Sequence, residues 1–353
     1  MLTDIFAYRY LDQPIWAQYT EVEKRLLNQA FGVVKDALPY YTHDGKENSE
    51  NKNKWNMLHD RLARELGVDE LSQRYYSYIT KNGLGQDCPV SGWYSWEHVC
   101  SQFVNVTYTG QCDADRFIKE RISFVELGLR LRGEEVAQAN ANLPNSITQA
   151  AIQDSKPRYG GITVPGIAVD GVKAWNATVN RILEGQVAEL NERFRRAKVP
   201  LTYHNGFIQF AMDEQIEKQI AKPFWDLVAD ELWTNVDIDM KEALDRRDSN
   251  DKDPAIFAAK ALESAIKIIS DRKNWTRGTE NGAAQYIDNL ISKANGSYLA
   301  VWEGEMLKDY FRRVRNSVGH GPGSEPMPEL SLPQTDWAIE TAMSWVRTLI
   351  RRM

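Results

Sequence analysis

The sequence predicts a mainly α-helical protein with one small β-hairpin, arranged in two domains. Three observations support this fold class. Apolar residues recur at helical spacing along most of the 353 residues, one Asn-Gly pair separates two short alternating segments, and the last third consists of successive helical segments. We place the domains at residues 1–222 and 223–353, with a mostly helical first domain and a second domain that is a bundle of about four to five helices.

In the first domain, apolar periodicity predicts helices over residues 15–38, 54–66, 116–132 and 181–196. Pro39 ends the first helix and Gly67 ends the second.

Two other segments of this domain predict loops, because residues 42–53 are polar and residues 137–165 are rich in Asn, Gln, Pro and Gly. Residues 201–210 predict a hairpin with Asn205-Gly206 at its turn. Within it we interpret His204 as a cross-strand polar residue rather than a catalytic group.

In the second domain, the same periodicity predicts helices over residues 224–247, 254–270, 283–294, 299–318 and 336–351. Asp253 before Pro254 predicts an N-cap, and Thr335 predicts the cap of the last helix. Gly319 can end the helix that begins at residue 299.

Composition indicates a soluble globular protein, with 42% hydrophobic and 26% charged residues. The net charge of −6 argues against nucleic-acid binding over the whole surface, although it allows one local basic stripe. The N-terminus lacks a basic region followed by an apolar run, and no apolar stretch reaches the length of a membrane span. We therefore expect a cytoplasmic protein with no membrane association.

The three cysteines, Cys88, Cys100 and Cys112, are widely spaced and form no Cys-x-x-Cys pair. This favours reduced thiols in a cytoplasm and predicts neither a metal site nor a cofactor. His98 near Cys100 could bind a metal, but we favour buried thiols beside a partly buried histidine. The aromatic segment 93–96 could stack nucleic-acid bases, but we favour a place in the core.

The segment Arg315-Asn316-Ser317-Val318-Gly319-His320 carries the candidate chemistry. Arginine stays protonated and can hold a phosphate through two parallel donors, while histidine can transfer a proton near neutral pH. Together they suit RNA cleavage without a metal, with His320 moving the proton, Arg315 stabilising charge on the phosphate oxygens, and Asn316 orienting the phosphate or the imidazole.

Two supporting cations, Lys308 and Arg312, are spaced with Arg315 so that the three share one helix face. Spacing alone favours a simpler interpretation of this region. In that interpretation a solvated arginine cluster complements the negative end of the helix and a histidine caps it.

Residues 255–353 resemble the C-terminal domain of abortive-infection proteins in the HEPN superfamily. The similar segments are 258–267 and 312–321, in the same order along the bundle. The superfamily signature is Arg, a polar residue that is often Asn, and then His a few residues later, which correspond here to Arg315, Asn316 and His320. The resemblance implies a homodimer in which Arg and His of both protomers line one cleft, where two basic stripes would meet.

The resemblance extends upstream. Residues 190–196, the hairpin at 201–210 and Lys222-Pro223 are similar to the end of the N-terminal domain of AbiJ-type proteins, and residues 6–10 resemble a divergent form of its beginning. Residues 70–180 carry no resemblance. Glu263, on the first bundle helix, is expected either to support Arg315 or to form an ordinary i,i+4 pair with Lys267, and the sequence leaves both open.

These features predict an antiphage effector with a metal-independent endoribonuclease site, for which tRNA is a family-level expectation of the RNA substrate. The N-terminal domain would sense a phage-derived trigger or another regulatory partner, or restrain the nuclease. Two alternatives stay open at this point. One is a HEPN bundle that has lost catalysis and binds RNA or dimerises, and the other is a toxin paired with a separate antitoxin.

Overall fold

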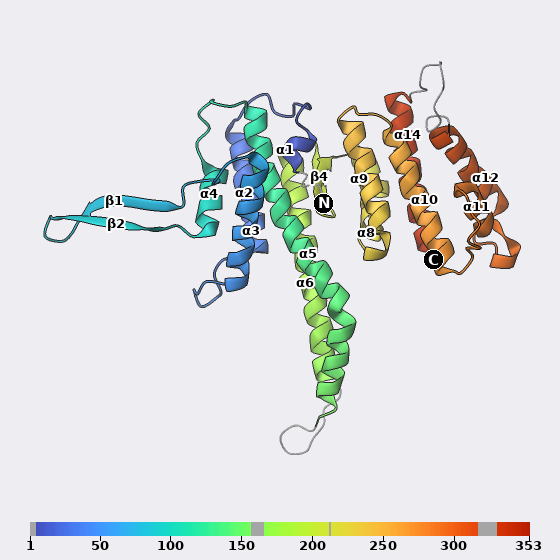
Figure 1. The fold of residues 1–353 in the computed structure, drawn as a ribbon, viewed down its shortest axis with the longest axis horizontal. Coiled ribbons are helices and arrows are strands. Elements are labelled where there is room, and N and C mark those ends of the chain that lie inside the picture. Colours follow the sequence, from blue (N-terminus) through green and yellow to red (C-terminus); the bar gives the residue numbers. More distant parts are fainter. Residues whose placement is uncertain (1–4, 157–165, 212, 317–329) are drawn as a thin grey trace. The chain divides into compact units, whose positions relative to one another are not determined.

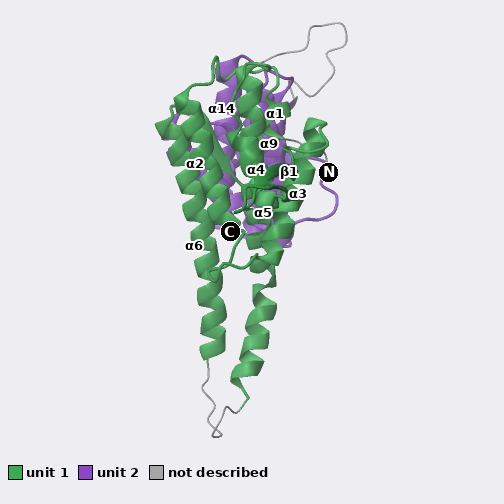
Figure 2. Ribbon diagram, turned by 90° about the vertical axis from the view of Figure 1, so that its left-hand side faces the viewer, with its two compact units in different colours: residues 1–208 green, residues 209–353 purple. Residues whose placement is uncertain are grey.

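The computed structural model describes residues 5–156, 166–211, 213–316 and 330–353. The fold is mainly α-helical with two small antiparallel hairpins, which confirms the predicted fold class (Figure 1). The chain divides into two compact units, residues 1–208 and 209–353 (Figure 2). This division falls inside strand β4, and the domain boundary after residue 222 stays a prediction.

The helices and strands from the N-terminus to the second hairpin are, in chain order, α1 (Phe6–Arg9), α2 (Glu21–Ala37), α3 (Ser49–Leu66), β1 (Tyr75–Lys81), β2 (Asp87–Trp93), α4 (Trp96–Asn105), α5 (Ala114–Asp154), α6 (Ile167–Arg196), β3 (Leu201–His204) and β4 (Phe207–Phe210).

Two predicted helix starts were wrong, because side-chain caps determine where these two helices begin. Helix α2 starts after Thr20 rather than at residue 15, since Thr20 and Glu23 form a reciprocal capping box. Helix α3 starts after Asn48 rather than at residue 54, because the Asn48 side chain accepts hydrogen bonds from two amides of the first turn. Its predicted end is confirmed, with Gly67 in the left-handed conformation at φ 69°.

The predicted loop over residues 137–165 was wrong where the structure describes it. Helix α5 continues to Asp154 and α6 begins at Ile167, and the two helices run side by side (Figures 1 and 2). Asn140 accepts hydrogen bonds from Asn176 at 2.8 Å and Asn180 at 2.9 Å. Asn140, which lies in the predicted loop, is therefore paired with asparagines of the neighbouring helix.

An aromatic cluster joins α2, α3 and α5. The ring centroids of Phe31, Trp55 and Phe124 lie 5.8–5.9 Å apart, and the Trp55 indole donates to the Leu38 carbonyl at 2.8 Å. Such rings bury large areas and find a partner for their polar atom, so they set how these three helices pack.

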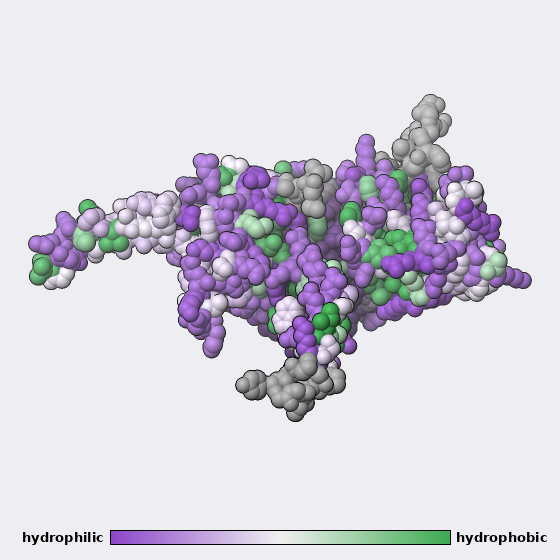
Figure 3. All heavy atoms as spheres, turned by 60° about the horizontal axis from the view of Figure 1, so that its bottom comes forward, coloured by the Kyte–Doolittle hydropathy of each residue, from purple (hydrophilic) through white to green (hydrophobic). Residues whose placement is uncertain are grey.

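The second hairpin is confirmed, and the first was not predicted. Asn205 (φ 41°) and Gly206 (φ 88°) form the left-handed turn between β3 and β4, and His204 is buried in β3. Strands β1 and β2 pair antiparallel, with Tyr75 opposite Trp93, and extend away from the helices of unit 1 (Figure 3).

Two expectations about side-chain burial in this region were wrong. Trp93, which we expected in the core, is 65% exposed because it lies on the projecting hairpin. Of the three cysteines, Cys100 is buried in α4, whereas Cys88 and Cys112 are exposed, and His98, expected to be partly buried, is exposed as well.

A buried carboxylate links α1, α5 and β4. Glu126 is fully buried and binds Arg9 through both oxygens, at 3.1 and 2.5 Å, and Arg130 at 2.8 Å. It also accepts the Ile208 amide at 2.7 Å. The Arg130 side chain in turn donates to the Gly206 carbonyl at 2.8 Å. The turn of the second hairpin is thereby fixed to α5.

The remaining elements are α7 (Glu214–Ile216), the π-helix η1 (Glu217–Ala221), α8 (Lys222–Val228), the 3-10 helix η2 (Glu231–Trp233), α9 (Thr234–Asp248), α10 (Pro254–Arg272), α11 (Ala283–Ile291), the 3-10 helix η3 (Lys293–Asn295), α12 (Val301–Tyr310), the π-helix η4 (Phe311–Asn316) and α14 (Leu332–Arg352).

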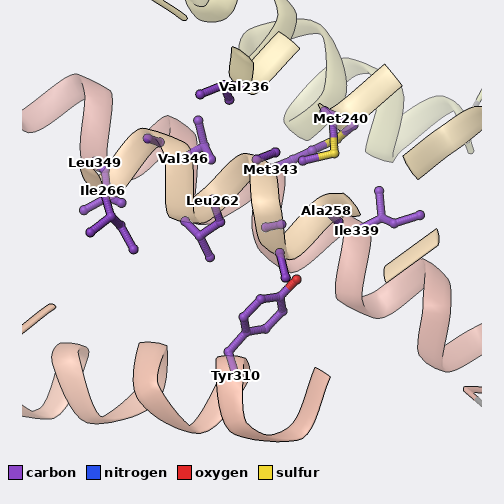
Figure 4. Packing of buried hydrophobic residues seen from close by; sticks show 14 of the residues in the cluster. Val236, Met240, Ala258, Leu262, Ile266, Tyr310, Ile339, Met343, Val346 and Leu349 are labelled. Atoms are coloured by element: carbon purple, nitrogen blue, oxygen red, sulfur yellow. The ribbon is translucent and has the colours of Figure 1, made fainter. Parts of the chain in front are cut away.

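Helix α10 is the centre of unit 2, packed between α9 and α14. Figure 4 shows apolar side chains of α9, α10 and α14 meeting there, with Tyr310 of α12 pointing toward them. The labelled members of this cluster are Val236, Met240, Ala258, Leu262, Ile266, Tyr310, Ile339, Met343, Val346 and Leu349. The helical bundle predicted for this part of the chain is present.

Local capping again corrects the predicted details. The helix predicted over 224–247 is interrupted, because the Asp230 side chain caps the short helix η2. Asp253 stands at the N-cap of α10 with φ 60°, but its side chain makes no cap hydrogen bond. Thr335 is buried inside α14, whose cap is Ser331 in a capping box with Gln334.

One residue of the apolar stripe predicted for helix 299–318 lies outside the core. From their spacing in the sequence, the predicted members of this stripe are Trp302, Leu307, Phe311, Val314 and Val318. Trp302 is 62% exposed, whereas Leu307, Phe311 and Val314 are buried. The predicted stripe member Val318 lies outside the described residues. Trp302 instead lines a shallow surface groove with Met306 of the same helix.

Replacement of Glu126 should destabilise the protein strongly. In Glu126→Gln, two buried guanidinium groups lose their carboxylate, so we expect the free energy of unfolding to fall by about 3–5 kcal/mol. Glu189→Gln is the matched control, because its i,i+4 pair with Arg193 is partly exposed to solvent and should contribute about 1 kcal/mol or less. Urea unfolding measures both, and equal losses in the two variants would contradict the role of Glu126.

Stability should also depend on the protonation of Asp248 at the end of α9. Burial raises the pKa of Asp248 from 3.8 to about 7, and the adjacent Arg247 only partly counteracts this. A raised folded-state pKa gives stability that is present below pH about 4 and is lost as pH rises toward about 7.

We therefore expect the free energy of unfolding of the wild type to fall between these pH values, and Asp248→Asn to remove most of that slope. Asp251→Asn is the control, because the Asp251 side chain is 56% exposed. A wild-type slope that persists in Asp248→Asn would refute the assignment.

Candidate functional site

The candidate site lies where α12 changes from an α-helix to the π-helix η4. Leu307, Phe311 and Val314 hold this segment in the core of unit 2, and the Tyr310 hydroxyl donates to the Ala338 carbonyl of α14 at 2.9 Å. A π-helical turn inserts an extra residue and shifts the phase of the side chains that follow it, and such turns are frequent at functional sites. Arg315 is on this turn.

Arg315 contacts Glu263 of α10. The Arg315 guanidinium donates through Nη1 to Glu263 Oε2, and Lys267 Nζ lies 2.9 Å from the other oxygen. Glu263 therefore makes both of the contacts that the sequence left open, one with Arg315 and one with Lys267. The Glu263 side chain is only 8% exposed, while that of Arg315 is 36% exposed. A buried carboxylate thus holds a guanidinium whose side chain still reaches the surface.

The two supporting cations have other partners. Lys308 Nζ lies 2.5 Å from Asp288 of α11, and Arg312 pairs with Asp309 of its own helix. Asp309 also binds Arg313 at 2.6 Å, and these two arginines, Arg313 first, hold the pKa of Asp309 below its ordinary value. Lys308, Arg312 and Arg315 therefore engage three different carboxylates.

Two of the predicted residues fall at or beyond the end of the described segment. Asn316 is the last residue of η4, and His320 lies outside the described residues. Their side-chain roles, and the pairing of His320 with Arg315, stay predictions.

Sequence reasoning missed further charged residues beside Glu263. Burial raises the pKa of Asp239 on α9, Lys260 of α10 lowers it, and the nearby Glu242 and Glu263 raise it. Lys260 Nζ also lies 4.1 Å from the ring centroid of Phe257. The sequence did contain a signal for this group of residues, because residues 257, 260, 263 and 267 recur at three- and four-residue spacing on α10.

This arrangement suits recognition of a phosphate. One guanidinium donor is used by Glu263, and an exposed arginine held in one orientation can direct the others toward an anion. Within the described ranges, no three His, Cys, Asp or Glu side chains form a group that could hold a metal ion. In the same part of the chain, no helix combines the length and apolar character that crossing a membrane requires.

Comparison with known proteins gives one match. Residues 4–226 match the family model described as AbiJ N-terminal domain 4. No curated protein and no solved structure matches the chain. The matched segment includes residues 70–180, in which the sequence carried no recognisable resemblance.

Removal of the Glu263 carboxylate should make Arg315 more reactive. In Glu263→Gln the guanidinium loses its ionic partner, so phenylglyoxal should modify Arg315 several times faster, as measured by peptide mass spectrometry. Arg313 is the internal control, because it pairs with Asp309 on the same turn and should react at an unchanged rate. An unchanged Arg315 rate would show that Glu263 does not hold it in solution.

Proposed function

The chain belongs to the AbiJ-type abortive-infection family, and on this premise we propose that it is an antiphage effector whose C-terminal bundle is a HEPN-type, metal-independent endoribonuclease. One observation carries the proposal. Arg315, within the Arg-Asn-Ser-Val-Gly-His segment, is held at the surface by the buried carboxylate of Glu263. The proposed chemistry requires a fixed positive charge, and Arg315 would supply it.

The proposed reaction is an internal transesterification of RNA. The ribose 2′-oxygen attacks the adjacent phosphorus, the bond from phosphorus to the 5′-oxygen breaks, and a 2′,3′-cyclic phosphate and a 5′-hydroxyl are formed. His320 helps to take the proton from the 2′-hydroxyl or to give one to the leaving 5′-oxygen. Arg315 stabilises the charge that builds on the phosphate oxygens, and Asn316 orients the phosphate or the imidazole.

The proposed site is shared by two copies of the chain. Arg315 and His320 of each protomer would line one cleft, as the HEPN resemblance implies. A paired cleft would bring two basic segments together, which would let a chain with net charge −6 bind an RNA such as tRNA. The N-terminal domain, the part that matches the family, would sense a phage-derived trigger or restrain the nuclease.

The test compares RNA cleavage and growth arrest by wild type, Arg315→Ala and His320→Ala. Loss of charge stabilisation should lower the cleavage rate about 10²- to 10³-fold in Arg315→Ala. Loss of proton transfer should lower it about 10²- to 10⁴-fold in His320→Ala. Arg313→Ala is the matched control, because Arg313 lies on the same turn and should leave the rate unchanged.

Other outcomes separate the alternatives. Wild-type cleavage rates in both variants would exclude the proposed site. Retention of RNA by purified wild type without cleavage products would favour a binding or dimerising bundle. Toxicity on expression of the chain alone would favour a toxin that needs a separate antitoxin, since a restrained effector should be tolerated.

A further inference from the structure

The β1–β2 hairpin is exposed to solvent along most of its length. Strands Tyr75–Lys81 and Asp87–Trp93 pair only with each other among the described residues. Large side chains such as Tyr78 (55%), Ile79 (71%) and Trp93 (65%) are exposed. Figure 3 shows the hairpin as a narrow extension with apolar and weakly polar residues on its surface. An isolated two-stranded hairpin is at best marginally stable in water, so further strands would stabilise it.

Aromatic contacts nevertheless give the hairpin one defined conformation. The Tyr75 and Trp93 rings meet edge to face across the strands, with their centroids 5.1 Å apart. Tyr76 covers Gly92, where an added Cβ would come within 2.6 Å of the Tyr76 hydroxyl. Cross-strand pairs of this kind fix the register of a sheet. The outer edges of the two strands are therefore defined surfaces.

The register shows which backbone groups face outward. The Asn82 amide donates to the Gln86 carbonyl and the Tyr94 amide donates to the Arg74 carbonyl, both at 2.9 Å. Because hydrogen-bonded and non-hydrogen-bonded pairs alternate in an antiparallel ladder, the even-numbered residues of β1 face β2. The amides and carbonyls of the odd-numbered residues, 75, 77, 79 and 81, face the outer edge.

The two outer edges differ in their capacity to bind another strand. On β2, Pro89 is opposite Ile79, in a non-hydrogen-bonded pair, so its nitrogen faces outward and has no hydrogen to donate. The edge of β1 contains no proline and has the sequence Tyr-Tyr-Ser-Tyr-Ile-Thr-Lys, which is rich in strand-forming residues. A further strand can therefore pair fully with β1 but not with β2.

We propose that β1 pairs antiparallel with β1 of a second copy of this chain, about a two-fold axis at Tyr78. This register lets the outward-facing Ser77 bond with Ile79 of the second copy, and Tyr75 with its Lys81. The two Tyr78 side chains are then directly opposite in a non-hydrogen-bonded pair. No like charges oppose each other, because each Lys81 faces a tyrosine.

The distribution of proline is what favours a second copy over an unrelated strand. Pairing of β1 with β1 produces a four-stranded sheet whose two outer edges are both β2. Each of these edges carries Pro89, so the sheet cannot grow further and the assembly closes at two copies. The same pairing raises the number of strands from two to four, which relieves the marginal stability of an isolated hairpin.

A cysteine at the axis tests this pairing in the full chain. In a Cys88→Ser, Cys112→Ser background, Tyr78→Cys should form a disulfide-linked dimer under mild oxidation, seen on a non-reducing gel. The two Cα atoms would be about 4.5 Å apart, within the range that a disulfide spans. Thr80→Cys is the matched control on the same face, where the two Cα atoms would be about 13 Å apart.

The cross-link reports contact between the two β1 strands rather than between the C-terminal bundles, and it requires no RNA cleavage, so its failure can be told apart from failure of the proposed nuclease. Equal cross-linking of the Tyr78→Cys and Thr80→Cys variants would overturn the proposal. A Tyr78→Cys variant that stays monomeric in the purified protein would also overturn it, and would favour a foreign peptide strand or a nucleic acid as the occupant of this edge.

A second pair of variants tests the edge itself. Ile79→Pro removes an outward amide from β1 and leaves the ladder between β1 and β2 intact, so adding it to the Tyr78→Cys variant should abolish cross-linking. Ser91→Pro makes the same change on the outer edge of β2 and should leave cross-linking unchanged. Circular dichroism checks that both variants fold, and cross-linking that survives Ile79→Pro would refute pairing through β1.

Discussion

Unit 1 depends on the buried carboxylate of Glu126. This group is fully buried and binds two arginines, from α1 and α5, and the backbone of β4. A charge in that position is stable only while all of its partners are present, because the interior does not solvate it. Through these contacts Glu126 joins α1, α5 and the second hairpin.

Glu263 has a comparable role in unit 2 with a different outcome. It also holds two cations, but the Arg315 and Lys267 side chains are 36% and 43% exposed, whereas those of Arg9 and Arg130 are 4% and 12% exposed. Around Glu126, the carboxylate and both guanidinium groups are largely buried and pair with one another. Around Glu263 the carboxylate is buried and its cations reach solvent, which is the arrangement that leaves a fixed positive charge available to a ligand.

Local sequence signals correctly predicted the elements that depend on residues close together in the sequence. The Asn205-Gly206 turn, the Gly67 helix end and the helical stripe through Leu307, Phe311 and Val314 were all found as predicted. The continuation of α5 to Asp154 was missed because Asn140 and its neighbours suggest a loop until Asn140 is paired with Asn176 of α6. The first hairpin was missed because its residues are exposed on both faces, so no apolar alternation marks it.

The sequence by itself determined the fold class, the family resemblance and the identity of the candidate residues, because periodicity, turn chemistry and motif spacing are local properties of the chain. Only the tertiary structure decided that Glu263 binds Arg315 and Lys267 at once, and that Lys308 and Arg312 have other partners. Glu263 and Arg315 are distant along the chain and meet only when α10 packs against η4. Contacts of this kind depend on helix packing and on the phase of the π-helical turn, neither of which residue spacing specifies.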